Sequence, residues 1–219
     1  VKVQGIRDLQ IANDLGRVDI HQEFAPFGVL GDKGAWLAFG CFEMACKPLQ
    51  EVCFSFNWQH LPACAGGLKE DYRTYDKDID NRSFKGRIEQ LRNRNWKPLS
   101  ETGECYLFRT SASAIPLKED PLIEHTSIEF RVTENTVLPV GEEERFQLSD
   151  ARSGFFRILL TEPEMGFGMH EYRRLFSEIM MYNSRARHKK ALPEAPLSLL
   201  MDSPELSYTA EEECVFKVG

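Results

Sequence analysis

Six cysteines and five histidines are the side chains of this 219-residue chain that could most readily take part in chemistry. Cys41, Cys46, His60 and Cys64 lie close enough in sequence to supply four metal ligands. Pro62 interrupts the last pair, however, and the paired short knuckles (C-x-x-C) of zinc sites do not occur. We therefore predict no metal and no cofactor. A Cys/His-containing metal-dependent enzyme remains an alternative.

The cysteines have a second interpretation, as disulfides. A chain of this size can bury a sizeable core without disulfide bonds, and the sequence does not open with a secretory signal peptide. The thiols are therefore predicted to be free and mostly buried, at Cys41, Cys46, Cys53, Cys64, Cys105 and Cys214.

Residues 76–81 (DKDIDN) open like a calcium-binding loop, with an acidic side chain at every second position. Position six of such a loop should be glycine, but it is Asn81. Position twelve should be a bidentate glutamate, but it is Arg87, a cation. The pattern therefore predicts a solvated acidic loop and no calcium site.

The common catalytic motifs are missing from the sequence: G-x-S-x-G, H-E-x-x-H, the P-loop and G-x-G-x-x-G. The histidines are scattered, and no cysteine stands in a recognisable nucleophile context. We therefore predict that the chain is not an enzyme and has no small-molecule substrate. A carbohydrate- or receptor-binding β-sandwich module is a further alternative.

The net charge of −7 and the isoelectric point near 5.4 argue against binding to nucleic acid, which needs a basic footprint. Residues 185–190 form the one basic cluster. We interpret them first as cations that complement a helix end, and second as a contact for an acidic partner protein.

No apolar run approaches the length of a membrane span, so none is expected. The chain also begins without Met or a signal peptide, which predicts a cytoplasmic protein that is not secreted by a signal peptide. Both ends of the sequence read as strands, which suggests a piece cut from a longer protein.

Most of the chain has the two-residue periodicity of β-strands. Between Val52 and Trp58 the large apolar residues occupy every second position, so one face of that strand should be buried. Further strands are expected at 35–39, 83–88, 105–108 and 127–132, and a short helix near 64–75. The fold class is therefore predicted as α+β, with β-dominated, sandwich-like antiparallel sheets.

The last third of the chain supplies the one long helix, over His170–Arg187. Residues 154–160 (GFFRILL) precede it and read as a strand buried on both faces. The helix carries an apolar stripe, which we expect to cover the sheet that contains this strand. The stripe consists of Tyr172, Leu175, Phe176, Ile179 and Met180.

A polar, small-residue stretch at 109–121 is the best candidate for a linker. It predicts a β-rich domain over 1–115 and a strand-turn-long helix unit over 116–219 that packs on it. A single compact domain is the alternative.

Two groups of short motifs resemble a known family. The first group is PFG (26–28), KPL (47–49) and LP (61–62), interleaved with the predicted strands. The second is GFFRILLTEP (154–163), GFG (166–168) and LPEAP (192–196). Together they are similar to the large baseplate wedge subunits of contractile injection systems, the phage baseplate J-like and type VI secretion TssF-like group.

The resemblance implies a structural scaffold that works through protein–protein contacts and has no catalytic residues. Its partners would be other baseplate subunits, which can include a second copy of itself. Protein interfaces favour Met, aromatic residues and Arg. The helix offers these types at Met181, Tyr182, Arg185 and Arg187, which we take as the candidate partner interface.

Overall fold

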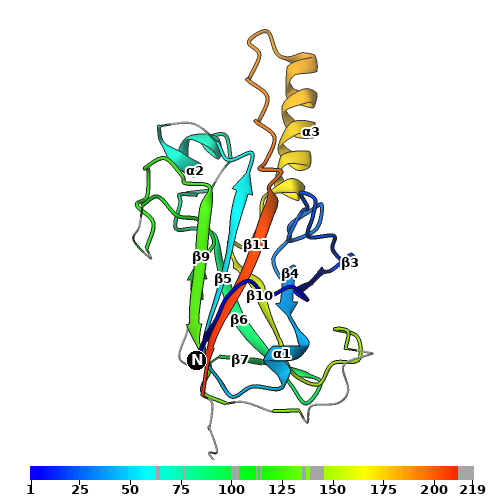
Figure 1. Ribbon diagram of the computed structural model, residues 1–219. Helices are drawn as coiled ribbons and strands as arrows, with labels where there is room; N and C mark the ends of the chain where they lie inside the picture. The colour runs from blue at the N-terminus through cyan, green and yellow to red at the C-terminus, as the bar shows by residue number, and fades with distance from the viewer. Residues whose placement is uncertain are drawn as a thin grey trace, which may run out of the picture.

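The computed structural model describes residues 1–62, 65–75, 77–99, 104–111, 113, 115–134, 137–138 and 146–211. Their fold is α+β, as predicted: two antiparallel β-sheets face each other, and one long helix lies near the C-terminal end of the chain (Figure 1). The prediction of β-dominated antiparallel sheets with one long and one short helix is confirmed.

The smaller sheet contains four strands. Their spatial order is β1 (Lys2–Val3), β11 (Leu200–Ala210), β5 (Leu49–Gln59) and β9 (His125–Arg131).

The larger sheet contains seven strands. Six follow one another in the order β3 (Gly16–Arg17), β2 (Gln10–Asn13), β4 (Trp36–Gly40), β10 (Phe155–Glu162), β6 (Lys85–Arg92) and β7 (Asn95–Pro98). The seventh, β8 (Glu104–Tyr106), pairs with β6.

The alternation predicted for 52–58 is confirmed in β5. Val52, Phe54, Phe56 and Trp58 are buried, and the residues between them are partly exposed. The buried face of β5 meets the larger sheet, where the ring of Phe54 stacks on that of Phe39 in β4 with centroids 4.1 Å apart. Aromatic contacts of this kind join the two sheets into one core.

Each sheet takes strands from both sides of residue 115. In the smaller sheet β5 hydrogen-bonds to β9 and β11, and in the larger sheet β4 and β6 both flank β10. The predicted units 1–115 and 116–219 therefore both contribute strands to each of the two sheets.

Three helices occur in the described part of the chain: α1 (Phe42–Ala45), α2 (Gly67–Asp71) and α3 (Met169–Arg185). The short helix expected near 64–75 is α2, and it is shorter than predicted. Tyr72 and Tyr75 follow it in turns and are buried against each other. None of the described helices has the length and apolarity needed to cross a membrane.

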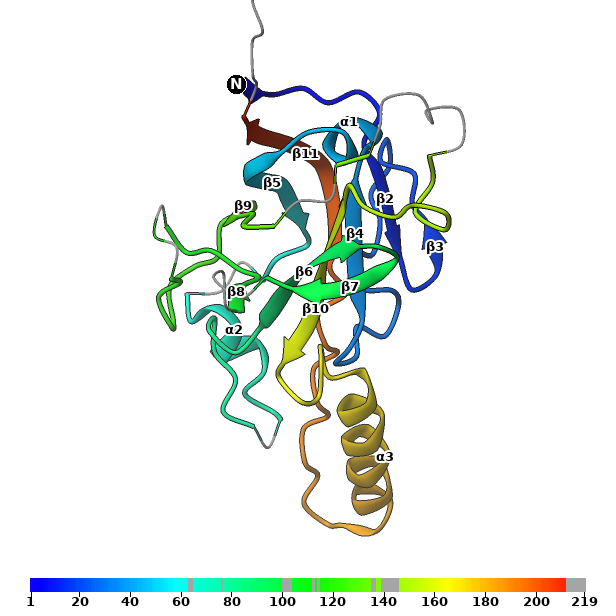
Figure 2. The same cartoon turned by 90° about the horizontal axis from the view of Figure 1, so that it is seen from below.

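The predicted packing of the long helix is wrong. α3 projects from the end of the sandwich and makes no extensive contact with any strand (Figures 1 and 2). Of the expected stripe, Leu175 alone is buried, whereas Met180 is exposed and the other three members are partly exposed. The stripe is amphipathic, but amphipathicity does not specify which neighbour covers it.

Strand β10 was predicted to be buried on both faces, but only one of its faces is buried throughout residues 156–160. Phe156, Ile158 and Leu160 point into the core, but Arg157 lies on the opposite face and is partly exposed. Arg157 binds Glu89 of β6 there, through Nε at 2.7 Å and Nη2 at 2.5 Å. An ion pair, rather than the long helix, thus occupies the outer face at the middle of β10.

Candidate partner interface on the long helix

The helix and the segment that follows it form a projection, which we call the α3 arm (residues 169–199). Gly168 has φ +89°, a left-handed conformation that favours glycine and lets the chain turn into the helix. At the base, the Tyr72 hydroxyl donates to the Phe167 carbonyl over 2.8 Å, and the Tyr75 hydroxyl donates to that of Glu194 over 2.9 Å. The arm is therefore fixed to the body at its base.

Beyond the helix, residues 187–199 run back alongside α3 toward the body (Figure 2). Asn183 holds this return segment at the far end. Its Nδ2 donates to the Lys190 carbonyl over 2.9 Å, and its Oδ1 accepts from the Lys190 amide over 2.8 Å. Pro193 and Pro196 are buried farther along. The return segment thus lies alongside the helix and is tied to its last turn.

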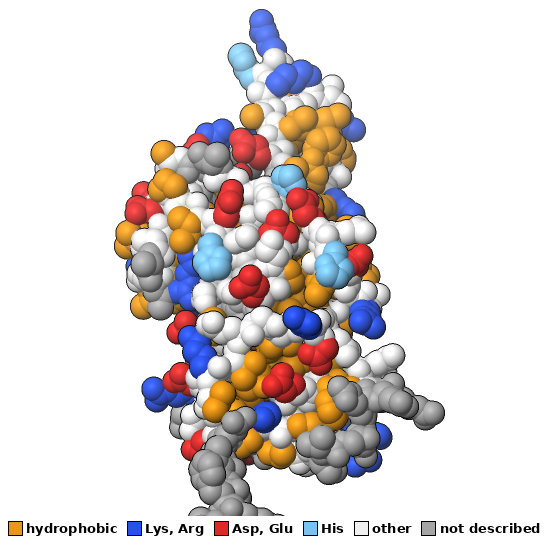
Figure 3. Space-filling model, viewed as in Figure 1, with side chains coloured by type: hydrophobic (Ala, Val, Ile, Leu, Met, Phe, Trp, Pro, Cys, Tyr) orange, Lys and Arg blue, Asp and Glu red, His pale blue; other side chains and the backbone are white. Residues whose placement is uncertain are grey.

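All four residues of the predicted interface lie exposed near the far end of the arm. The exposed fractions of Met181 and Tyr182 are 69% and 46%. Met181 and Arg185 are four residues apart and so share one face of the helix, whereas Arg187 follows the helix. Figure 3 shows hydrophobic side chains gathered over the arm and basic side chains at its tip.

The interpretation of the cations as helix-end groups holds for one of them. The Lys189 ammonium donates to the Asn183 carbonyl in the last turn of α3. Lys190 instead lies over the ring of Tyr182, with Nζ 4.6 Å from the centroid. Arg185 and Arg187 are exposed and make no ion pair with any described residue.

Sequence reasoning missed the residues that shape the arm. From the sequence, no contact was assigned to Asn183, and Pro193 and Pro196 were noted only as part of the LPEAP motif. The sequence signal that could have indicated a return segment is an asparagine near the end of the predicted helix, followed by two prolines.

The residues weighed as possible metal ligands are not gathered into a site within the part of the chain that the structure describes. No group of three or more His, Cys, Asp or Glu side chains there is arranged to hold a metal ion. Cys64 lies outside the described residues. Cys41, Cys46, Cys53 and Cys105 form no disulfide bond; Cys41 is buried, and the other three residues are partly exposed.

Cys41 directly precedes α1, a position that in a longer helix would favour a thiolate. Burial acts in the opposite direction here and raises the pKa of Cys41 to about 12. Burial likewise raises the pKa of Cys105 to about 12. Both thiols are therefore protonated at neutral pH and are poor nucleophiles.

These pKa values predict the order in which a thiol reagent labels the native protein. Near neutral pH, Cys53 on the outer face of the smaller sheet should react well before Cys41 and Cys105, which stay protonated until the pH approaches their raised pKa. Mass spectrometry of the labelled peptides measures this order. Labelling of Cys41 as fast as Cys53 would contradict it. In denaturant, six thiols should react, including Cys64 and Cys214, which lie outside the described residues.

The acidic segment after α2 has a structural role that the sequence did not indicate. Asn81 is buried, and its Oδ1 accepts from the Leu68 amide over 2.9 Å while its Nδ2 donates to the carbonyls of Leu117 and Asp120. Ile79 is buried as well. The prediction of a solvated loop is therefore wrong for these residues, and Asp76 lies outside the described part.

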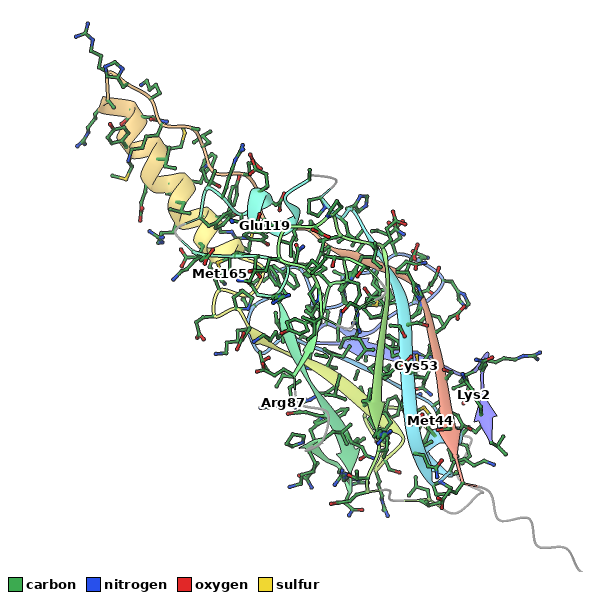
Figure 4. All side chains as sticks on the ribbon, turned by 90° about the vertical axis from the view of Figure 1, so that its left-hand side faces the viewer. Lys2, Met44, Cys53, Arg87, Glu119 and Met165 are labelled. Atoms are coloured by element: carbon green, nitrogen blue, oxygen red, sulfur yellow. The ribbon has the colours of Figure 1, made fainter. Side chains whose placement is uncertain are left out.

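A hollow of about 890 Å³ lies on the outer face of the smaller sheet. Lys2 of β1 and Cys53 of β5 line it from the two sides of β11 (Figure 4). Sugar-binding sites usually offer an exposed aromatic ring for stacking. Phe130 and Tyr208, the aromatic residues of the lining, are both buried, so this hollow offers no such platform.

Comparisons with known proteins add no assignment. No protein-family model matches the sequence. A search of curated proteins likewise finds no match.

Proposed function

We propose that this chain is an assembly domain in the baseplate of a contractile injection machine, a phage tail-like or type VI secretion-like apparatus, and that it acts through protein–protein contacts without turnover. Its partners are other baseplate subunits, which can include a second copy of the chain. Such baseplates assemble in the cytoplasm, and the proposal places the chain there.

The α3 arm is the observation that carries the proposal. A helix that projects from its own sandwich leaves Met180, Met181 and Tyr182 in solvent, although their burial would be favourable. Met and Tyr are enriched at protein interfaces. The arm is also fixed at its base and along its length, so a partner would meet a preformed surface.

The proposal predicts that changes in the arm separate assembly from folding. Replacing Tyr182 and Arg185 together with Ala should cost less than about 1 kcal/mol of stability, because both side chains are exposed. The same variant should co-purify with the neighbouring baseplate subunits in clearly lower yield. Co-expression with those subunits, followed by affinity purification and thermal unfolding of the isolated chain, measures both effects.

A control variant changes one exposed apolar residue and one exposed basic residue elsewhere. Val29 and Lys97 are exposed on the body, so Val29→Ala combined with Lys97→Ala should leave both assembly and stability unchanged. The interface assignment is wrong if the arm variant assembles as well as the control, or if it unfolds.

A further inference from the structure

The tip of the α3 arm concentrates positive charge. Arg185, Arg187, Lys189 and Lys190 are exposed and lie within six residues of one another, and no Asp or Glu occurs between Ile179 and Pro193. The net charge of the whole chain is −7 with these four cations included, and it is −11 without them. The tip is therefore opposite in sign to the rest of the molecule.

Several cations elsewhere in the molecule have carboxylate partners, which these four do not. Lys85 contacts Glu104 and Glu162, and Arg157 contacts Glu89. Even Arg174, in the same helix, lies between Glu171 and Glu178. Within the described residues, none of the four tip cations contacts a carboxylate. No carboxylate among the described residues thus relieves their mutual repulsion.

Hydrogen bonds fix the backbone of the tip, although its cations have no carboxylate partner among the described residues. Asn183 fixes the backbone of Lys190 by two hydrogen bonds, and the Lys189 ammonium donates to the Asn183 carbonyl. A fixed loop loses less conformational entropy on binding than a free one. The structure therefore presents a cluster of cations whose backbone is ordered before any partner arrives.

The surroundings of the cluster fit a protein better than a nucleic acid. Single-stranded nucleic acids stack their bases on open aromatic faces. Near the tip, Lys190 covers one face of the Tyr182 ring, and the exposed imidazole of His188 is a smaller stacking surface. Met181, which is flexible and apolar, shares a helix face with Arg185 and suits an apolar side chain of a protein. The acidic body would also repel a long polyanion.

We infer that the tip of the α3 arm docks on an acidic surface of a partner protein, where carboxylates pair with Arg185, Arg187, Lys189 and Lys190 and an apolar side chain packs on Met181. The inference rests on the proposed function, since it names the chemistry of the partner at the same arm.

The test uses the full chain and a helical peptide with Glu on one face and Leu on the other. Fluorescence anisotropy should detect binding that weakens as salt is raised. Arg185→Glu combined with Arg187→Glu should weaken binding about tenfold or more, because two attractions become repulsions. A peptide with Lys in place of Glu should bind this variant more tightly than it binds the unaltered chain.

Controls separate the inference from general attraction between charges. Arg94→Glu combined with Lys97→Glu changes the net charge equally on the body and should leave peptide binding unchanged. The same peptide with Ser in place of Leu should bind more weakly. The inference is overturned by no binding of the Glu/Leu peptide, by equal effects of the two variants, or by tighter binding to single-stranded DNA or to anionic lipid vesicles.

Failure here is distinguishable from failure of the proposed function. The Arg185→Glu, Arg187→Glu variant is also tested for co-purification with the neighbouring subunits. If it assembles normally while the Tyr182→Ala, Arg185→Ala variant does not, the arm is an interface but its partner surface is not acidic. If neither variant affects assembly, the proposed function itself fails at this arm.

Discussion

Phe54→Ala is expected to lower the free energy of unfolding by about 3–5 kcal/mol, the usual cost of truncating a buried phenylalanine. Phe54 is fully buried at the centre of β5, and its ring stacks on Phe39 across the two sheets. Truncation would leave a cavity where the sheets meet, and neighbouring rings fixed in two different sheets would relax only in part. Denaturant unfolding followed by tryptophan fluorescence measures the loss.

Phe176→Ala is the matched control for this experiment. It removes the same atoms from the partly exposed face of the α3 arm, where the ring contacts Tyr172 at a centroid distance of 5.8 Å. Its cost should be about 1 kcal/mol, because little apolar area returns to water and no closed cavity forms. Equal losses for Phe54 and Phe176 would contradict the projecting position of the arm.

The second large effect is expected at Glu89 on the outer face of β6. Its side chain is 5% exposed, and its carboxylate accepts from Arg87 at 2.8 Å and from Arg157 at 2.5 Å. Glu89→Ala would leave the partly buried Arg157, which also lies over the ring of Trp96, without its counter-charge. Removing one partner of a buried pair costs about 3–5 kcal/mol, so a loss of that order is expected.

Glu104→Ala provides the comparison, because Glu104 pairs with Lys85 in the same sheet but is 46% exposed. Exposed pairs contribute about 0–1 kcal/mol, so this variant should unfold almost as the parent chain does. Chemical denaturation of both variants at neutral pH tests the difference. A loss at Glu89 no larger than that at Glu104 would show that water reaches the Glu89 carboxylate freely.

The strands of this fold were predictable where burial acts on one face only. In β5 the sequence alternates because Phe54, Phe56 and Trp58 all face the other sheet, and that periodicity is a local property. The pairing of strands was not predictable in the same way. β10 lies between β4 and β6, and nothing in the spacing of one strand specifies partners so distant in the chain.

The candidate partner interface was likewise predictable in its composition but not in its packing. The composition of the arm, with Met181, Tyr182 and Arg185 in one helix, predicted surface residues suited to a partner, and the structure places them in solvent. The helical stripe did not reveal that α3 projects from the sandwich, because an amphipathic pattern does not specify which neighbour covers the apolar residues. Tertiary packing decides this, and it depends on residues far from the helix in sequence.

The position of β11 has a consequence for how the protein folds. This strand lies between β1 and β5 in the smaller sheet, and Lys2 pairs with Thr209 across almost the whole described chain. Such a high contact order makes closure of the sheet slow, because a long loop must be ordered before the contacts form. During synthesis, the backbone edge of β5 stays open until Leu200–Ala210 has left the ribosome. In that interval an apolar strand with a free edge can pair with a neighbouring chain, so the nascent protein is most exposed to aggregation just before β11 arrives.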